Sequence, residues 1–318
     1  MTTALFILLI LIATGFVTLN VVAYNNARRM TRFLPPGSMP RCPDSSSVVA
    51  RIRFLVTGPR IPRPVNATTP ADHDLPFETV FVTTADGLQL ELWDIPAQTP
   101  RGSVTMFHGY GGQKEAMLED AQCFHDLDLN VVIVDFRGSG GSDGNITTIG
   151  IAEAHDVIAT VSWAKTRYPE GRMILFGVSM GAVAILRAVK HHALRPEAVI
   201  MLCPFERLVT TVAHRFEELG APPFPSAHLL TFWGGLQCGF NGFRHNPVDD
   251  AAALTSPCLL LHASCDPRVS VAEVRRVHGA LRGPRQLYIF EGLTHESYIQ
   301  ARPEEYRRVV AQWIEGLT

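Results

Sequence analysis

One serine in this chain lies in a pattern that is typical of a catalytic nucleophile. Ser179 stands at the centre of Gly-x-Ser-x-Gly at residues 177–181. The residues before it, 172–176, have the apolar and β-branched character of a strand, and residues 182–190 favour a helix. A Gly-Ser-Gly cluster alone is more often a plain turn, but a serine on a sharp strand-to-helix turn exposes its hydroxyl beside a helix N-terminus. The context therefore predicts that Ser179 is a nucleophile.

A serine hydroxyl is a weak nucleophile at neutral pH, so it needs a histidine to take its proton and an acid to orient that histidine. Asp266 follows an apolar run at 257–263 that predicts a buried strand, and His295 follows the next predicted strand, 286–290. Neighbouring parallel strands end at the same edge of a sheet, so the three residues can converge. We expect Ser179 to attack, His295 to act as base and Asp266 to orient it.

Other residues compete for these roles. Asp249 and Asp250 precede the strand at 257–263, and Glu291 is too close to His295 in sequence to reach its far ring nitrogen easily. A surface-loop role is the simpler alternative for His295 in a chain with 12 histidines. The order serine, acid, histidine and the placement after strands favour Asp266 and His295.

An acyl-transfer site also needs backbone N–H donors for the oxyanion. One should come from Met180, the residue after the nucleophile, and another from the glycine-rich loop 108–112, where we expect the Tyr110 N–H. A flexible turn or a phosphate-binding loop is the alternative for these glycines. Neither their spacing nor a later ribose-binding acid matches a dinucleotide fingerprint.

The elements that must position these residues alternate along the chain. A turn at Thr84–Gly87 separates two strands in a hairpin, and helices alternate with the later strands. This order predicts an α/β fold with a mostly parallel sheet covered on both faces. The eight predicted strands are 78–83, 88–95, 103–107, 131–135, 173–177, 198–202, 258–262 and 286–290.

From about Phe77 to Thr318 the chain resembles the α/β-hydrolase superfamily, through the motifs at 108–112, 135–142 and 177–181 with Asp266 and His295. Within it, the sequence is similar to membrane-anchored serine hydrolases of the BEM46-like and related bacterial group. These share an Asp-x-Arg-Gly-x-Gly-x-Ser loop, for which we expect a structural role. The resemblance implies the fold and the roles given above, but no substrate.

Metals and cofactors are not needed for this chemistry. Glu153–Asp156 and His191–His192 could be metal ligands, but neither has the His-x-x-x-His spacing of a zinc site, and we expect them on helix surfaces. The net charge of −2 gives no indication of nucleic-acid binding. Cys123, Cys203 and Cys258 lie in apolar segments, where free buried thiols are ordinary.

The N-terminus predicts a membrane anchor. Ala4–Tyr24 is apolar, uncharged and long enough to cross a bilayer. A cleaved signal peptide is the alternative, but no basic residue precedes the run and the cleavage site is poor. Arginines 28, 29 and 32 follow it, so the positive-inside rule places the catalytic domain of this single-pass cell-membrane protein in the cytoplasm.

The predicted domains are an anchor at 1–27, a proline-rich linker at 28–76 and a catalytic domain at 77–318 with a small cap at about 204–247. The prolines predict an extended spacer, and its apolar run 48–56 either packs against the catalytic domain or lies on the membrane. The cap aromatics either line an acyl pocket or form the core of the cap; they are Phe205, Phe216, Phe224, Phe232, Trp233, Phe240 and Phe243.

The expected function is therefore a serine hydrolase that cleaves carboxylic esters through an acyl-enzyme and acts on a small molecule with an apolar acyl group. A peptidase, amidase or thioesterase could use the same three residues. A non-catalytic binding protein is the alternative of a different class, although binding alone requires no triad.

Overall fold

The computed structural model of the chain describes residues 2–40 and 47–317, which form two compact units. The sheet unit consists of Arg63–Arg207 and the residues from Asn246 onward. The anchor–cap unit consists of the residues up to Pro62 together with Leu208–His245. Residues 41–46 of the expected linker, including Pro43, lie outside the described residues.

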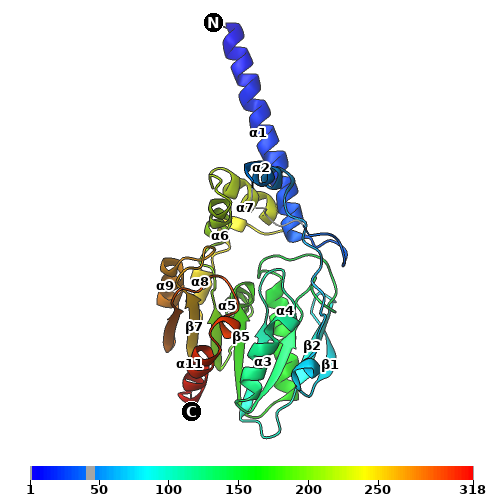
Figure 1. Cartoon of the computed structure of the whole chain (residues 1–318), viewed down its shortest axis with the longest axis vertical. Helices are drawn as coiled ribbons and strands as arrows, with labels where there is room; N and C mark the ends of the chain where they lie inside the picture. The colour runs from blue at the N-terminus through cyan, green and yellow to red at the C-terminus, as the bar shows by residue number, and fades with distance from the viewer. Residues whose placement is uncertain (1, 41–46, 318) are drawn as a thin grey trace. The chain divides into compact units, whose positions relative to one another are not determined.

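The sheet unit contains one eight-stranded sheet with the strand order β1-β2-β4-β3-β5-β6-β7-β8 (Figure 1). Every predicted strand is present, with ends that differ from the prediction by at most two residues. The strands are β1 Glu78–Thr83, β2 Gln89–Ile95, β3 Gly102–Phe107, β4 Leu129–Val134, β5 Arg172–Val178, β6 Ala198–Leu202, β7 Cys258–Ala263 and β8 Arg285–Phe290.

Only β2 runs against the direction of the other strands. β1 pairs antiparallel with β2, and β2 pairs antiparallel with β4. The turn between β1 and β2 closes with a hydrogen bond from Gly87 N to Thr84 O at 2.9 Å, and Gly87 has a φ of 87°, which favours glycine. All pairs from β4 to β8 are parallel, so the residues that follow β3, β5, β6, β7 and β8 share one edge of the sheet.

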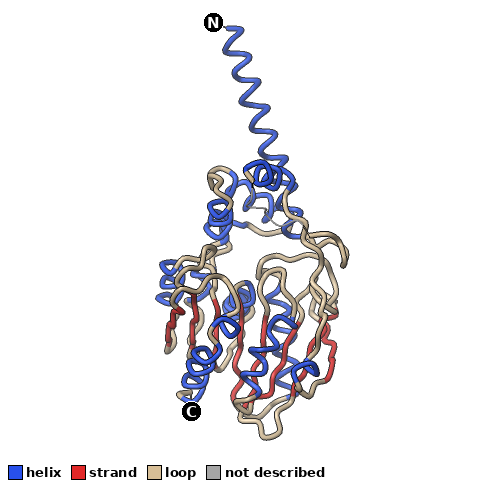
Figure 2. The backbone as a smooth tube through the Cα atoms, viewed as in Figure 1, coloured by secondary structure: helices blue, strands red, loops and turns tan. Residues whose placement is uncertain are grey.

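Helices cover both faces of this sheet, as predicted (Figure 2). On one face, buried side chains of α3, α10 and α11 pack against the sheet. Phe124 of α3 and Phe176 of β5 are in contact there, with 5.3 Å between ring centroids. Strands β3 and β4 are buried along their whole length, as a strand with helices on both faces must be. The helices are η1 Pro70–His73, η2 Lys114–Met117, α3 Leu118–His125, α4 Glu153–Arg167, α5 Met180–His191, α8 Pro247–Ala251, α9 Val271–Ala280, α10 Tyr298–Ala301 and α11 Pro303–Glu315.

The anchor–cap unit is helical. It contains α1 Thr2–Thr31, α2 Val48–Thr57, α6 Leu208–Glu218, α7 Ser226–Gln237 and the short η3 Gly242–Arg244. Within it α1 packs against α7, α2 packs against α1, and α6 packs against α7. The helix α1 is long and apolar enough to cross a membrane, properties that a signal sequence shares. It continues past residue 27, and α2 occupies part of the segment expected to be extended.

Candidate active site

The predicted nucleophile sits on a sharp turn between β5 and α5. Ser179 has φ 49° and ψ −105°, a backbone conformation that non-glycine residues rarely adopt. The flanking glycines make this turn possible. A Cβ atom on Gly177 would lie 2.5 Å from Ala182 N, and one on Gly181 would lie 2.2 Å from Phe107 O. The Gly-x-Ser-x-Gly pattern therefore reflects the close approach of strand, turn and helix.

The predicted acid and base meet each other. His295 Nδ1 lies 2.7 Å from Asp266 Oδ2. The other oxygen of this carboxylate, Oδ1, accepts hydrogen bonds from Arg268 N at 2.8 Å and Val269 N at 3.0 Å. Burial raises the pKa of Asp266, but the hydrogen bonds from His295 and these two N–H groups outweigh it and hold the pKa below its usual value.

A fourth residue, which was not among the predicted site residues, joins this cluster. Cys203 follows β6. Its sulfur, a carboxylate oxygen of Asp266 and a ring nitrogen of His295 all lie within 4.8 Å of one another. Ser179 N donates a hydrogen bond of 2.7 Å to Leu202 O, the residue before Cys203. The ends of four adjacent parallel strands, β5 to β8, thus bring the nucleophile turn, the thiol, the carboxylate and the imidazole together.

Cys203 was expected to be an ordinary buried thiol, and it is buried, but it lies beside the base. Burial lowers the pKa of His295, whereas the neighbouring Cys203 and the Asp266 carboxylate raise it, with a net rise to about 10. The signal that could have found Cys203 is the rule already used for Asp266 and His295. It is the first residue after a parallel strand, at the edge where the other site residues lie.

The loop expected to supply the second oxyanion donor lies against the nucleophile turn. A Cβ atom on Gly109 would be 3.8 Å from Ser179 Cβ and 3.6 Å from Val178 O. Met180 begins helix α5, and Tyr110 follows Gly109 in the loop. The close approach of Gly109 to Ser179 is compatible with the predicted oxyanion donors, Met180 N–H and Tyr110 N–H, whose roles remain predictions.

The buried His108 fixes the start of this loop. Its Nε2 accepts a hydrogen bond of 3.0 Å from Phe136 N, so Nδ1 carries the proton that is donated to Gly109 O at 2.8 Å. Burial lowers the pKa of His108 and outweighs the nearby carboxylates, which raise it. A neutral His108 therefore links the glycine-rich loop to the loop after β4.

The loop at 135–142 has an extensive network of contacts. Arg137 binds Asp156 on α4 and Asp86 in the β1–β2 turn, with guanidinium–carboxylate distances of 2.6 and 2.8 Å.

The acidic residues at the start of α4 are also held by hydrogen bonds. Glu153 accepts hydrogen bonds from the N–H groups of Thr148 and Gly150, both at 2.9 Å. The prediction that Glu153 and Asp156 lie on a helix surface is wrong, since both are fully buried by these contacts. His191 and His192 are exposed, as expected.

A buried lysine completes the same network. The ammonium group of Lys114 contacts the carboxylates of Asp135 and Glu91 and lies 4.4 Å from the centre of the Trp93 ring. Lys114 and Asp135 are wholly buried. Asp135 also accepts a hydrogen bond from Lys114 N at 2.8 Å, which ties the loop after β3 to the end of β4.

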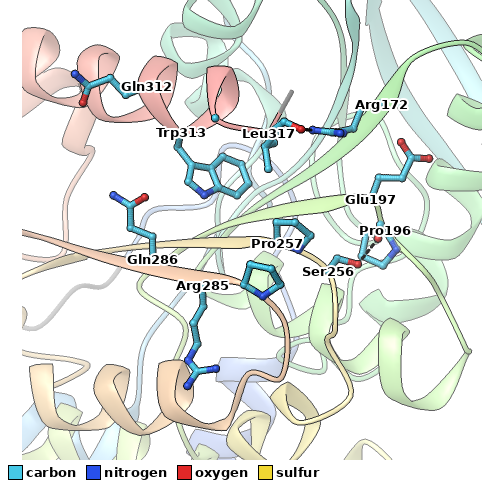
Figure 3. Close-up of a pocket in the computed structure, with 12 residues that line it drawn as sticks. Arg172, Pro196, Glu197, Ser256, Pro257, Arg285, Gln286, Gln312, Trp313 and Leu317 are labelled. Atoms are coloured by element: carbon cyan, nitrogen blue, oxygen red, sulfur yellow. Dashed lines mark hydrogen bonds between the residues drawn. The ribbon is translucent and has the colours of Figure 1, made fainter.

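A surface pocket lies at the opposite edge of the sheet, where β5 to β8 begin (Figure 3). Its lining includes Arg172 and Arg285 at the first positions of β5 and β8, and Glu197 and Pro257 just before β6 and β7. The candidate catalytic residues follow the other ends of these strands. This pocket therefore does not contain the predicted catalytic residues.

The sheet order, the nucleophile turn and the acid–base pair define the α/β-hydrolase fold. The family model described as serine aminopeptidase, S33, matches residues 98–231. An esterase of Pyrococcus furiosus has a structure that is 26% identical, with a TM-score of 0.68, and the match covers 80% of this chain and 96% of that one. The chain is a hydrolase of the α/β-hydrolase superfamily.

Two related sequences match this chain over most of its length. The uncharacterised protein YqkD of Bacillus subtilis is 28% identical over 244 residues, 76% of this chain and 80% of the relative. A monoacylglycerol lipase of Mycolicibacterium smegmatis is 25% identical over 256 residues, 70% of this chain and 91% of the relative. The narrower resemblance to the BEM46-like group remains a prediction.

Proposed function

We propose that this protein is a serine hydrolase that cleaves carboxylic esters by way of an acyl-enzyme. The observation that carries the proposal is the 2.7 Å contact between His295 Nδ1 and Asp266 Oδ2 at the sheet edge where Ser179 occupies its strained turn. An oriented imidazole at the same sheet edge as a serine on a sharp turn is the combination that acyl transfer requires.

The first half of the reaction forms the acyl-enzyme. His295 Nε2 takes the hydroxyl proton as Ser179 Oγ bonds to the ester carbonyl carbon. The N–H groups of Met180 and Tyr110 stabilise the negative oxygen that results. When this intermediate collapses, the bond to the alcohol oxygen breaks and His295 returns the proton to the leaving alcohol.

The second half releases the acid. A water molecule gives a proton to His295 and attacks the acyl carbon, and the bond to Ser179 Oγ then breaks as the proton returns to the serine. Asp266 keeps the imidazole in the tautomer with hydrogen on Nδ1 and stabilises its charged form. His295 carries out every proton transfer with Ser179, the alcohol and water, so the cycle needs no metal and no cofactor.

The substrate we favour is an ester with an apolar acyl group. A monoacylglycerol lipase and an esterase are among the similar proteins, and both names describe ester cleavage. The family model takes its description from an aminopeptidase, which makes amide cleavage the second candidate. Thioester cleavage would use the same residues.

We place the enzyme at the cell membrane, with α1 as a single-pass anchor. Arg28, Arg29 and Arg32 follow the apolar run, which favours a cytoplasmic catalytic domain. Protease digestion of spheroplasts tests the side: a cytoplasmic domain is protected until the membrane is broken, and a domain outside is cleaved at once.

The experiment that tests the function compares leaving groups on matched acyl chains. Purified full-length protein is assayed with p-nitrophenyl esters of increasing acyl length, the matching thioesters and aminoacyl p-nitroanilides. We expect ester cleavage that increases from acetyl to medium chains and is lost in Ser179→Ala. Cleavage of the anilides alone would replace the esterase proposal with the aminopeptidase one.

A further inference from the structure

The two units of this chain carry opposite charge. The anchor–cap unit contains nine arginines and three acidic residues, a net charge of +6. Since the whole chain has a net charge of −2, the sheet unit carries −8. A basic unit that contains a membrane-spanning helix suits the negative surface of a membrane with anionic lipids.

Helix α1 changes its surroundings part of the way along its length. Its apolar side chains from Leu5 to Val21 are largely exposed, whereas Ala23 and Ala27 are buried within the unit. At this transition Trp233 Nε1 donates a hydrogen bond of 3.1 Å to Asn20 Oδ1, and the Trp233 ring lies 5.4 Å from that of Tyr24. Tryptophan and tyrosine are the residues that concentrate at membrane–water boundaries. The boundary therefore falls where α7 meets α1.

Helices α2 and α7 meet α1 at the same level. Asn26 Nδ2 donates a hydrogen bond of 3.1 Å to Leu55 O of α2. A Cβ atom on Gly234 of α7 would lie 3.9 Å from Ala27 Cβ, one residue further along α1. Both helices thus lie beside the end of the apolar run.

Helix α2 has an apolar face with no partner among the described residues. Val48, Val49, Ile52 and Val56 are 54–76% exposed, and no side chain of α2 is buried. At 100° per residue these four positions fall within one 100° arc, and the half-buried Arg51 and exposed Arg53 flank it on either side. An apolar arc bordered by arginines is the pattern of a helix that lies in a membrane surface.

The cap presents apolar side chains at the same level. Phe232 and Leu236, one turn apart on α7, are 47% and 59% exposed, and Phe224 and Phe243 on either side of α7 in sequence are also exposed. These aromatics were expected to line an acyl pocket or form the core of the cap, and three of them instead face outward. Isolated exposed apolar residues are ordinary, but a group continuous with a membrane span marks a further contact with lipid.

We propose that α2 and the exposed apolar side chains of α7 insert into the boundary between headgroups and acyl chains of a bilayer that contains anionic lipid. This inference rests on the proposed membrane anchoring by α1 and adds a second, interfacial contact to it. Arginines of the unit face the lipid phosphates, and the cap is held at the membrane surface by the Asn20–Trp233 contact.

Fluorescence quenching in lipid nanodiscs tests this contact in the full-length protein. Bimane is attached to Ile52→Cys on α2 or to Leu236→Cys on α7, with Cys42, Cys238 and Cys265 changed to serine. Leu9→Cys on α1 serves as the reference for the span. Phe81→Cys, exposed on β1 of the sheet unit, serves as the matched control.

We expect doxyl-labelled lipid to quench bimane at 52 and 236, as it does at 9, and to leave bimane at 81 unquenched. Aqueous iodide should quench only the label at 81. Quenching at 52 should fall when anionic lipid is replaced by zwitterionic lipid and when Arg51 and Arg53 are both changed to glutamine.

Other results overturn the inference in distinct ways. Lipid quenching at 9 but not at 52 and 236 leaves the anchor in place and rejects the interfacial contact. Shielding of 52 and 236 from both quenchers means that a second copy or another protein covers this surface. Quenching at 52 that ignores lipid charge rejects the role of anionic lipid. No quenching at 9 rejects the membrane anchor itself, and none of these results depends on esterase activity.

Discussion

His295 and Asp266 form a pair with a contact of 2.7 Å, although 28 residues separate them in sequence. Two parallel strands make this contact possible, because β7 ends before Asp266 and β8 ends before His295 at the same edge of the sheet. The backbone N–H groups of Arg268 and Val269 hold the carboxylate from its other side. The imidazole is thereby oriented before any substrate binds.

Substitution Asp266→Asn tests whether this orientation is catalytic. Asparagine has nearly the same shape but favours the wrong imidazole tautomer, so kcat should fall by roughly 10⁴-fold with little change in fold. Steady-state kinetics and circular dichroism measure the two effects. Asp249→Asn, at an exposed acid weighed as an alternative, should leave kcat unchanged; an equal loss in both variants would contradict the assignment.

The pH dependence of the reaction reports on Cys203. His295 must be neutral to act as a base, and its pKa is raised to about 10, so kcat/KM should fall as the pH drops below that value. In Cys203→Ala one of the influences that raise this pKa is lost, and the acidic limb of the profile should move to lower pH. A profile that does not move would show that the thiol does not act on the imidazole.

Buried charge makes Asp135 important for stability. Asp135→Ala would leave the ammonium group of Lys114 buried with only Glu91 as a carboxylate partner, which should cost about 3–5 kcal/mol in the free energy of unfolding. Urea denaturation of the purified protein measures this loss. The exposed pair Arg307–Asp126, with a 2.9 Å contact, gives the matched control, because Asp126→Ala should cost about 1 kcal/mol or less.

Two glycine substitutions should have opposite results, one at the nucleophile turn and one on a helix away from it. Gly181→Ala would place a methyl group 2.2 Å from the backbone oxygen of Phe107, so the turn must shift and activity should be lost. Gly279→Ala on α9 meets nothing within 4 Å and should raise stability by about 0.5–1 kcal/mol through better helix propensity. Thermal unfolding and ester cleavage separate the two cases. Full activity in Gly181→Ala would contradict the close packing of the turn.

Much of the sheet unit could be predicted from local pattern. Parallel strands buried on both faces appear as apolar runs, and each run here ends within two residues of its predicted boundary. The pair His295–Asp266 followed from the rule that such strands end at one edge. The Ser179 turn followed from two glycines whose Cβ atoms would collide with backbone.

Most of the features that were missed depend on contacts that are remote in sequence. Asp156 looks like a solvent-facing residue of a helix, and only its contact with Arg137 in the loop after β4 allows it to be buried. Glu153 is buried by hydrogen bonds from the turn just before α4, a local contact that the helical pattern does not indicate. The contact between Asn20 and Trp233 joins residues 213 positions apart, so no periodicity could assign the cap to the same unit as the N-terminal helix.

Labelling with a fluorescent fluorophosphonate, which reacts only with an activated serine, tests whether Ser179 is the nucleophile. Wild-type protein, Ser179→Ala and the exposed-site control Ser162→Ala are treated alike and compared on a gel. We expect labelling of the wild type and of Ser162→Ala, and none of Ser179→Ala. Labelling that survives in a folded Ser179→Ala variant, or that is missing from folded wild-type protein, would contradict this role of Ser179.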